Sequence, residues 1–341
     1  MNAKFRTICS RMAPTLLLAA TACQGKSTPV EVTSVPSMAP PPSDTATAPF
    51  QGAIPVAFPA ERADQTGDVD SSANAARKMV SGGEEFVHGL YERPFNADAM
   101  DKYFPFLDIV DFQGFMDDTW GYAAITVAGT DPNGGLPAQY GLELDLDRDG
   151  RGDWLIRASN PTRTQWSTQG VQAWNDADAE IGGVKVMTAD DTPYIGNGYE
   201  ALVFDQGNGT LTDGAWVRVE PNNPETVEIA FKLSMVGSPS SYAMGAWAGT
   251  NIDPAMFDHN DAMTHAQAGS PLPDYAMYPL KALAEIDNTC RLAIGFAPTV
   301  KEPGLCATAE KEAQEAEGGD SGCPGEVCYL VGDQEICRCP N

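Results

Sequence analysis

The stretch YGLELDLDRDGRGDWLIRA, residues 140–158, decides the fold prediction. Its first half is apolar at every second position, as in a β-strand with one face on a core. These apolar residues are Tyr140, Leu142, Leu144 and Leu146. An acidic turn with two glycines follows, and a second strand is expected at residues 153–158. The stretch therefore predicts a β-hairpin with one buried and one polar face.

Similar short segments recur along the chain and are separated by Asp, Asn and Gly turns. Regularly spaced strands of this kind are typical of an antiparallel sandwich, and the chain has no alternation with long helices that would indicate an α/β fold. We predict an all-β, jelly-roll-like, two-sheet antiparallel β-sandwich over residues 71–306. Its strands are expected at 121–128, 140–147, 153–158, 170–174, 199–205, 215–220, 226–233 and 291–296.

Residues 251–287 interrupt this pattern. Asp253 followed by Pro254 has the chemistry of a helix start, and the Gly-Ser-Pro run at 269–271 ends it. We expect a short helical insertion there. Residues 307–319 are polar and lack an apolar face, which favours a spacer before a Cys-rich tail at 320–341.

The N-terminus has the layout of an export signal. Basic residues precede a short apolar run within residues 1–22, too short to span a bilayer. The run Ala-Thr-Ala-Cys at 20–23 resembles a bacterial lipobox, with plain cleavage after Ala22 as the alternative. We expect lipidation of Cys23, export, and anchoring in the membrane of the cell envelope at its outer surface. The Pro-, Ser- and Thr-rich residues 23–70 are expected to be a disordered tether.

Six cysteines remain after Cys9 and Cys23 are set aside, and an even number in an exported chain favours disulfides. A two-residue turn at 332–333 would place two of the tail cysteines opposite each other. The alternative for the four tail cysteines is a zinc site. The expected disulfides are Cys290–Cys306, Cys328–Cys337 and Cys323–Cys339.

The chain carries a formal net charge of -26, which argues against nucleic acid as a partner, because phosphate binding needs clustered Lys and Arg. Two acidic stretches are instead typical of cation loops. The first matches the beginning of a calcium loop but has Ile156 where an EF-hand has its closing Glu. Ca²⁺ is the expected cofactor, and a solvated acidic turn is the alternative. The candidate ligands are Asp145, Asp147, Asp149, Arg151 through its carbonyl, and Asp153, with a weaker set at Asn175, Asp176, Asp178 and Glu180.

Catalytic signals are weak. No nucleophile elbow or phosphate-binding glycine loop is present, so no catalytic residue is assigned. Asp258, Asp261 and His265 are the candidates if the protein is an exported hydrolase, and helix capping is their structural alternative. Trp166 and Trp174 flank a polar connection and could present flat faces to sugar rings, although packing in the core or at its rim is the favoured interpretation.

The motifs YGLELDLDRDGRGDWLI, GYEALVFD, YPLKAL and EPGLC resemble an uncharacterised family of bacterial secreted proteins and lipoproteins over about residues 90–306. That resemblance implies no activity. The order of the segments around GYAAITVAG and YGLELDLD is distantly similar to carbohydrate-binding and DOMON-like sandwich domains. The expected function is non-enzymatic binding of a glycan or envelope component by a calcium-stabilised surface lipoprotein, with a hydrolase or a purely structural protein as alternatives.

Overall fold

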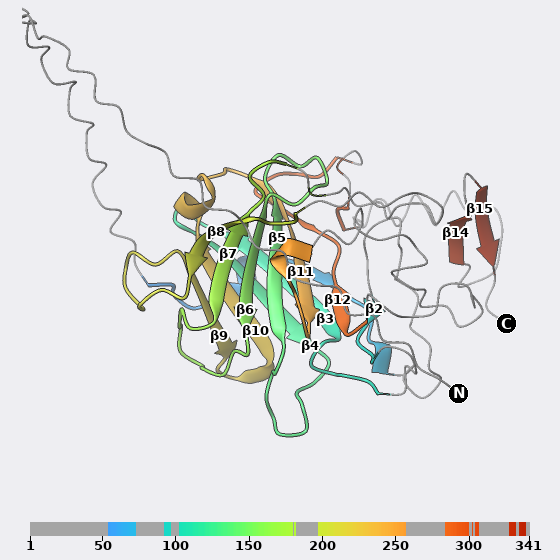
Figure 1. Cartoon of the computed structure of the whole chain (residues 1–341), viewed down its shortest axis with the longest axis horizontal. Helices are drawn as coiled ribbons and strands as arrows, with labels where there is room; N and C mark the ends of the chain where they lie inside the picture. Colours follow the sequence, from blue (N-terminus) through green and yellow to red (C-terminus); the bar gives the residue numbers. More distant parts are fainter. Residues whose placement is uncertain are drawn as a thin grey trace, which may run out of the picture. The chain divides into compact units, whose positions relative to one another are not determined.

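The computed structural model describes residues 54–72, 92–96, 102–179, 181, 197–256, 284–299, 302, 304–306, 327–331 and 334–338. These residues form two antiparallel sheets packed face to face, which confirms the predicted sandwich (Figure 1). Among them, no helix is long and apolar enough to cross a membrane.

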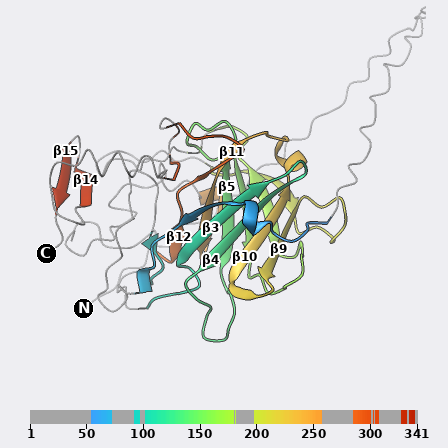
Figure 2. The ribbon, with the colours of Figure 1, turned by 180° about the vertical axis from the view of Figure 1, so that it is seen from behind.

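The first sheet has five strands and is seen in front in Figure 2. Its strands, in spatial order, are β1 (Asp64–Gly67), β3 (Ile109–Met116), β4 (Trp120–Val127), β10 (Asn223–Lys232) and β9 (Ala215–Glu220).

The second sheet has eight strands. Its centre is the acidic hairpin that the sequence predicted, formed by β5 (Gln139–Asp145) and β6 (Trp154–Ser159). β13 (Leu292–Ile294) pairs with β11 (Tyr242–Gly249) beside the main path. The path runs through β2 (Glu92–Arg93), β12 (Ile286–Asn288), β11 (Tyr242–Gly249), β5 (Gln139–Asp145), β6 (Trp154–Ser159), β7 (Val171–Asn175) and β8 (Ala201–Asp205).

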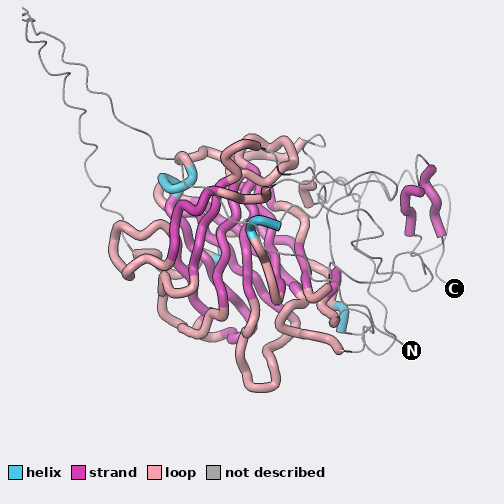
Figure 3. The backbone as a smooth tube through the Cα atoms, in the orientation of Figure 1, coloured by secondary structure: helices cyan, strands magenta, loops and turns pink. Residues whose placement is uncertain are grey.

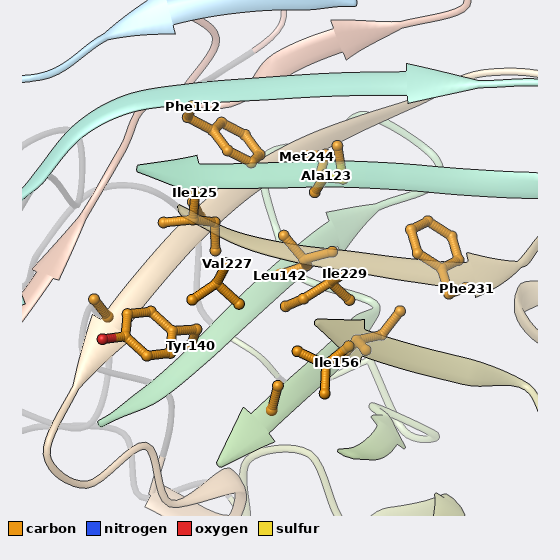
Figure 4. Packing of buried hydrophobic residues seen from close by; sticks show 14 of the residues in the cluster. Phe112, Ala123, Ile125, Tyr140, Leu142, Ile156, Val227, Ile229, Phe231 and Met244 are labelled. Carbon is orange, nitrogen blue, oxygen red and sulfur yellow. The ribbon is translucent and has the colours of Figure 1, made fainter. Parts of the chain in front are cut away.

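The core lies between the sheets and is built from alternate residues of both. Tyr140, Leu142 and Ile156 of the eight-stranded sheet face Phe112 and Ile229 of the five-stranded sheet (Figure 4). All five are completely buried, as period-2 alternation requires of the inner face. Trp154 belongs to this core, whereas Trp247, Trp120 and Trp216 are buried in two separate apolar clusters.

The outer face of the eight-stranded sheet differs from the expectation of a solvated polar face. Glu143 and Asp145 point away from the core, yet their residues are only 8% and 1% exposed. A second apolar cluster that includes Tyr199, Trp247 and Ile252 covers this face. The central hairpin is therefore buried on both sides, and the predicted polar face becomes an interior polar layer.

The predicted disordered tether at 23–70 is too long. Residues 54–70 are ordered, and β1 pairs with β3 in register from Asp64 opposite Gly114 to Gly67 opposite Asp111. The sandwich therefore begins before residue 71. This segment lacks the apolar periodicity of a strand, but backbone hydrogen bonds to the edge strand β3 hold it in an extended conformation. The signal at 1–22 and Cys23 lie outside the described residues, as does the spacer at 307–319.

The region predicted as a helical insertion, 251–287, is described only at its ends. A 3-10 turn, η5, spans Pro254–Met256, and the last two residues of the region belong to β12. Five strands of the two sheets were not predicted, namely β1, β2, β3, β11 and β12. The small residues of β11 give no alternation.

The closing strand is fastened by the predicted disulfide between Cys290 and Cys306. The Cys-rich tail contains a separate two-stranded sheet, β14 (Val327–Val331) and β15 (Gln334–Arg338). Its backbone register places position 328 opposite position 337, as the turn at 332–333 predicted. The disulfides Cys328–Cys337 and Cys323–Cys339 stay predictions.

Candidate functional site: two acidic loops beside a cleft

The two acidic loops lie at one end of the eight-stranded sheet. β5 ends and β6 begins there, and so do the end of β7 and the start of β8, because these four strands are successive antiparallel neighbours. Connections gather at the two ends of the sheets (Figure 3). Strand pairing thus brings together loops that are about 25 residues apart in the sequence.

The first loop is folded around the carboxylate of Asp145. Its Oδ1 accepts a hydrogen bond from the amide of Arg148 at 2.6 Å, and its Oδ2 accepts one from the amide of Gly150 at 2.9 Å. Both donors have positive φ, 66° at Arg148 and 94° at Gly150, which closes the turn. The loop is therefore shaped by its own backbone donors.

Three of the predicted ligands converge. Carboxylate oxygens of Asp145, Asp147 and Asp149 lie within 4.8 Å of one another, and the last two side chains are exposed. Each of these exposed carboxylates also accepts an amide two residues on, from Asp149 at 3.2 Å and from Arg151 at 2.8 Å. The group could hold a metal ion.

Arg151 and Asp153 are placed differently from the other three. The guanidinium of Arg151 donates to the carbonyl of Ile181 at 2.7 Å, and Asp153 Oδ2 accepts the amide of Leu146 at 2.5 Å. Asp153 lies outside the 4.8 Å group. Burial raises its pKa, and the neighbouring carboxylates of Asp147 and Asp149 raise it further.

A buried ion-pair network supports the loop from beneath. Arg291 lies 3.1 Å from Glu143 Oε2 and 3.5 Å from Asp145 Oδ2. Glu143 also accepts from the hydroxyl of Tyr199 at 2.7 Å and from the indole of Trp247 at 3.4 Å. Burial raises the pKa of Asp145 to about 6 although Arg291 and the loop amides act to lower it. Sequence reasoning missed Arg291 and Tyr199, which lie on remote segments.

The second loop also forms a carboxylate group. Asp176, Asp178 and Glu200 lie within 4.8 Å of one another, and in the described ranges this is the second of two such groups. Glu200 was not predicted; β7–β8 pairing, with Asn175 opposite Ala201, brings it beside Asp176. Glu180 lies outside the described residues.

The two loops are joined by hydrogen bonds but remain separate acidic groups. The backbone carbonyl of Asp153 accepts from the side chain of Asn175 at 2.9 Å and from the amide of Asp176 at 3.0 Å. Asn175 therefore links the two loops through its side-chain hydrogen bond. The second loop adds no carboxylate to the group formed by the first loop.

A cleft of ≈ 590 Å³ lies on the outer face of the same sheet. Its floor is Arg157 of β6 with Gln172 and Trp174 of β7, and the segments 197–200 and 251–255 form its sides. The Arg157 guanidinium lies 4.8 Å from the centroid of the Trp174 ring, and its Nη2 donates to Gln172 Oε1 at 2.5 Å. Glu200 belongs both to the cleft and to the second acidic loop.

The remaining candidate residues lie elsewhere. Trp166 packs with the aromatic cluster of the five-stranded sheet and donates its indole hydrogen to the carbonyl of Val56 at 2.9 Å. It therefore does not share a surface with Trp174. The candidates for hydrolysis, Asp258, Asp261 and His265, lie outside the described residues.

Comparisons of the chain with protein-family models, curated proteins and solved structures found no match. The class of protein that fold and site define is thus an antiparallel β-sandwich with a polar, tryptophan-containing cleft and two carboxylate loops.

Proposed function

We propose that this chain is an exported, lipid-anchored surface protein of a bacterial cell envelope that binds a glycan without catalysis. The observation that carries the binding proposal is the cleft on the outer face of the eight-stranded sheet, where Trp174 lies among amide, guanidinium and carboxylate side chains. Sugar rings offer an apolar face for such an indole and hydroxyls for such polar groups. Export and anchoring rest on residues 1–23.

The polar groups of the cleft favour a neutral or weakly charged glycan. Arg157 is already engaged by Gln172 and by the carbonyl of Ile252, so its plane is fixed beneath the ligand. Two carboxylates, Glu200 and Asp253, line the same cleft. They would repel a strongly anionic polymer, whereas they accept hydrogen bonds from hydroxyl groups.

We also propose that the first acidic loop binds Ca²⁺. Hard oxygen ligands from Asp147 and Asp149, together with a lone pair of Asp145, suit this ion, and the loop amides hold the carboxylates in position. Arg291 lies against Asp145 and already supplies a positive charge on the buried side of the loop. The ion would therefore stiffen the exposed half of the loop.

A glycan array tests the binding proposal, using the chain from residue 24 onward in calcium-containing buffer. We expect selective binding of a glycan class by the parent protein, with loss on Trp174→Ala and weakening on Gln172→Ala. Trp166→Ala is the matched control, because it removes an indole that packs against the other sheet, away from the cleft, and should keep binding. No binding to any glycan, or equal loss in both tryptophan variants, would contradict the proposal.

Anchoring is tested in the producing bacterium by fractionation. Cys23→Ser should move the protein from the membrane to the soluble fraction, because lipidation of that thiol supplies the acyl chains. Cys9→Ser, within the leader, is the control and should leave the distribution unchanged. Membrane residence of the Cys23→Ser protein would refute lipidation.

A further inference from the structure

Glu200 stands where the cleft meets the second acidic loop. It directly precedes β8, which runs beside β7 at the edge of the eight-stranded sheet (Figure 1). Its side chain lines the cleft, and its carboxylate also lies within 4.8 Å of those of Asp176 and Asp178. Because Asp178 and Glu200 are both exposed, a ligand in the cleft has access to this carboxylate group.

Backbone amides occupy only part of this carboxylate group. Asp176 accepts amides with both of its oxygens, at 2.9 and 3.0 Å. Glu200 Oε1 accepts the amide of Ala177 at 2.9 Å. Glu200 Oε2 and both oxygens of Asp178 accept no hydrogen bond from the part of the chain that the structure describes. The loop therefore presents three carboxylate oxygens to a ligand.

The negative charge at the Glu200 end of the cleft is not balanced within the protein. Neither Asp178 nor Glu200 forms an ion pair within the described ranges. Arg157 is the only basic side chain among the described residues that line the cleft, and it donates to Gln172 at 2.5 Å. Burial lowers the pKa of Arg157, and the charge of Asp253 opposes that shift. Arg157 therefore shares its charge with Asp253, which leaves the Glu200 end negative.

The strand register places this negative end close to the indole of the cleft floor. Trp174 is paired with Leu202, so their side chains lie on the same face of the sheet. Glu200 is two residues before Leu202, which is about 7 Å along an extended chain, and it lines the same cleft as Trp174. A sugar ring on Trp174 would thus carry a substituent to the carboxylate of Glu200.

A primary ammonium group matches the three open oxygens better than a hydroxyl group or a metal ion does. It has three N–H donors and a positive charge, so it satisfies several acceptors and also offsets their charge. A hydroxyl group has one donor and no charge. Ca²⁺ takes about six to eight oxygen ligands, more than the loop leaves open.

We propose that the ligand of the cleft is a glycan with a free primary amine on one sugar, bound as an ammonium by Glu200 and Asp178. The inference rests on the glycan-binding function proposed above and names the ligand class within it. The sugar ring lies on Trp174, and its amino group reaches the Glu200 end of the cleft. A single amine keeps the ligand weakly charged, so Arg157 on the floor does not exclude it.

Matched pairs of amino-sugar disaccharides test this ligand class. The probes are disaccharides of the gluco and galacto series in which one 2-amino group is either free or acetylated. Each is titrated by calorimetry into the chain from residue 24 onward. Acetylation removes the charge and leaves a single N–H donor while the ring is kept. We expect the free amine to bind at least about tenfold more tightly in one series, because acetylation removes charge-assisted hydrogen bonds.

Glu200→Gln is the deciding variant. Its side-chain carbonyl can still accept the amide of Ala177, while the open and charged Oε2 is replaced by an amide group. The preference for the free amine should fall to about threefold or less, and the affinity for the acetylated disaccharide should change little. Glu61→Gln is the control, because it makes the same change at an exposed residue before β1, and it should keep the full preference.

Equal or weaker binding of the free amine in both series would overturn the inference, and so would a Glu200→Gln protein that keeps the full preference. Binding of neutral glycans alone on the glycan array would overturn the amine and leave the glycan-binding function standing. No binding to any glycan would overturn both. Binding that requires CaCl₂ and is equal for the free and acetylated disaccharides would place a metal ion at the Glu200 group, which also contradicts the inference.

Discussion

Arg291 Nη2 lies 3.1 Å from Glu143 Oε2, and both side chains are buried on the outer face of the eight-stranded sheet. The same guanidinium reaches Asp145, so one cation serves two carboxylates at positions i and i+2 of β5. Tyr199 completes the arrangement by donating to the other oxygen of Glu143. One buried network thus supports both the first acidic loop and a side of the cleft.

Replacement of Arg291 should be strongly destabilising. Arg291→Met leaves two buried carboxylates without their cation, and we expect a loss of about 3–5 kcal/mol in the free energy of unfolding. Urea denaturation monitored by tryptophan fluorescence measures this change. The exposed Arg163 offers the control, because Arg163→Met should alter stability by less than about 0.5 kcal/mol. Equal stability of both variants would show that the network contributes nothing.

Calcium should raise the melting temperature. At a concentration about 100-fold above Kd, an ion stabilises the folded state by about 2.7 kcal/mol, which is roughly 5–10 °C for a domain of this size. Differential scanning calorimetry in EDTA and after addition of CaCl₂ measures the shift. Asp147→Asn should abolish it, whereas Asp118→Asn, an exposed carboxylate in the β3–β4 turn, should keep it. A parent protein that melts identically in EDTA and calcium has no such site.

Gly152 should not tolerate a side chain. A Cβ at this position would lie 1.9 Å from Tyr199 Oη and 2.5 Å from Glu143 Oε1, so Gly152→Ala must displace the buried network. We expect a cost of about 1–3 kcal/mol, measured by urea denaturation. Gly67→Ala is the comparison, because its nearest neighbour is 4.0 Å away, and its effect should be small. Similar costs at both positions would contradict the close packing at Gly152.

The Cys290–Cys306 disulfide closes a sequence separation of 16 residues. Cys290→Ser/Cys306→Ser should lower the free energy of unfolding by about 3 kcal/mol, because a loop of this length gains entropy in the unfolded chain. Cys328→Ser/Cys337→Ser, in the tail hairpin, should leave the sandwich transition unchanged. Non-reducing peptide mapping checks the predicted tail pairs. A shared effect on the sandwich would mean that the tail contributes to its core.

The hairpin at 140–158 was predictable because alternation over four apolar positions is a local signal. The same rule failed for β11, whose residues are all buried and include small side chains such as Ala243 and Gly245. A strand buried on both faces has no polar positions to reveal its period.

The candidate site was predictable only in part. Asp145, Asp147 and Asp149 are close in sequence, so a single turn is enough to bring their carboxylates together. A local pattern could therefore predict this group. Glu200 joins Asp176 through pairing across residues 176–200, a separation that no local pattern encodes. Trp174 belongs to β7, whereas Trp166, eight positions earlier, lies in the connection between β6 and β7 and packs against the aromatic cluster of the five-stranded sheet.

By itself, the sequence determined the all-β class, the acidic hairpin and the pairing of Cys290 with Cys306, because residue alternation, turn chemistry and cysteine number are local or countable properties. Tertiary structure decided that Glu143 and Asp145 are interior groups that both pair with Arg291, and that a cleft forms around Trp174. The physical reason is that burial and ion pairing on the outer face of a sheet depend on which segment, distant in sequence, packs against that face. No local pattern in the sequence specifies that segment; it is set when the two sheets pack.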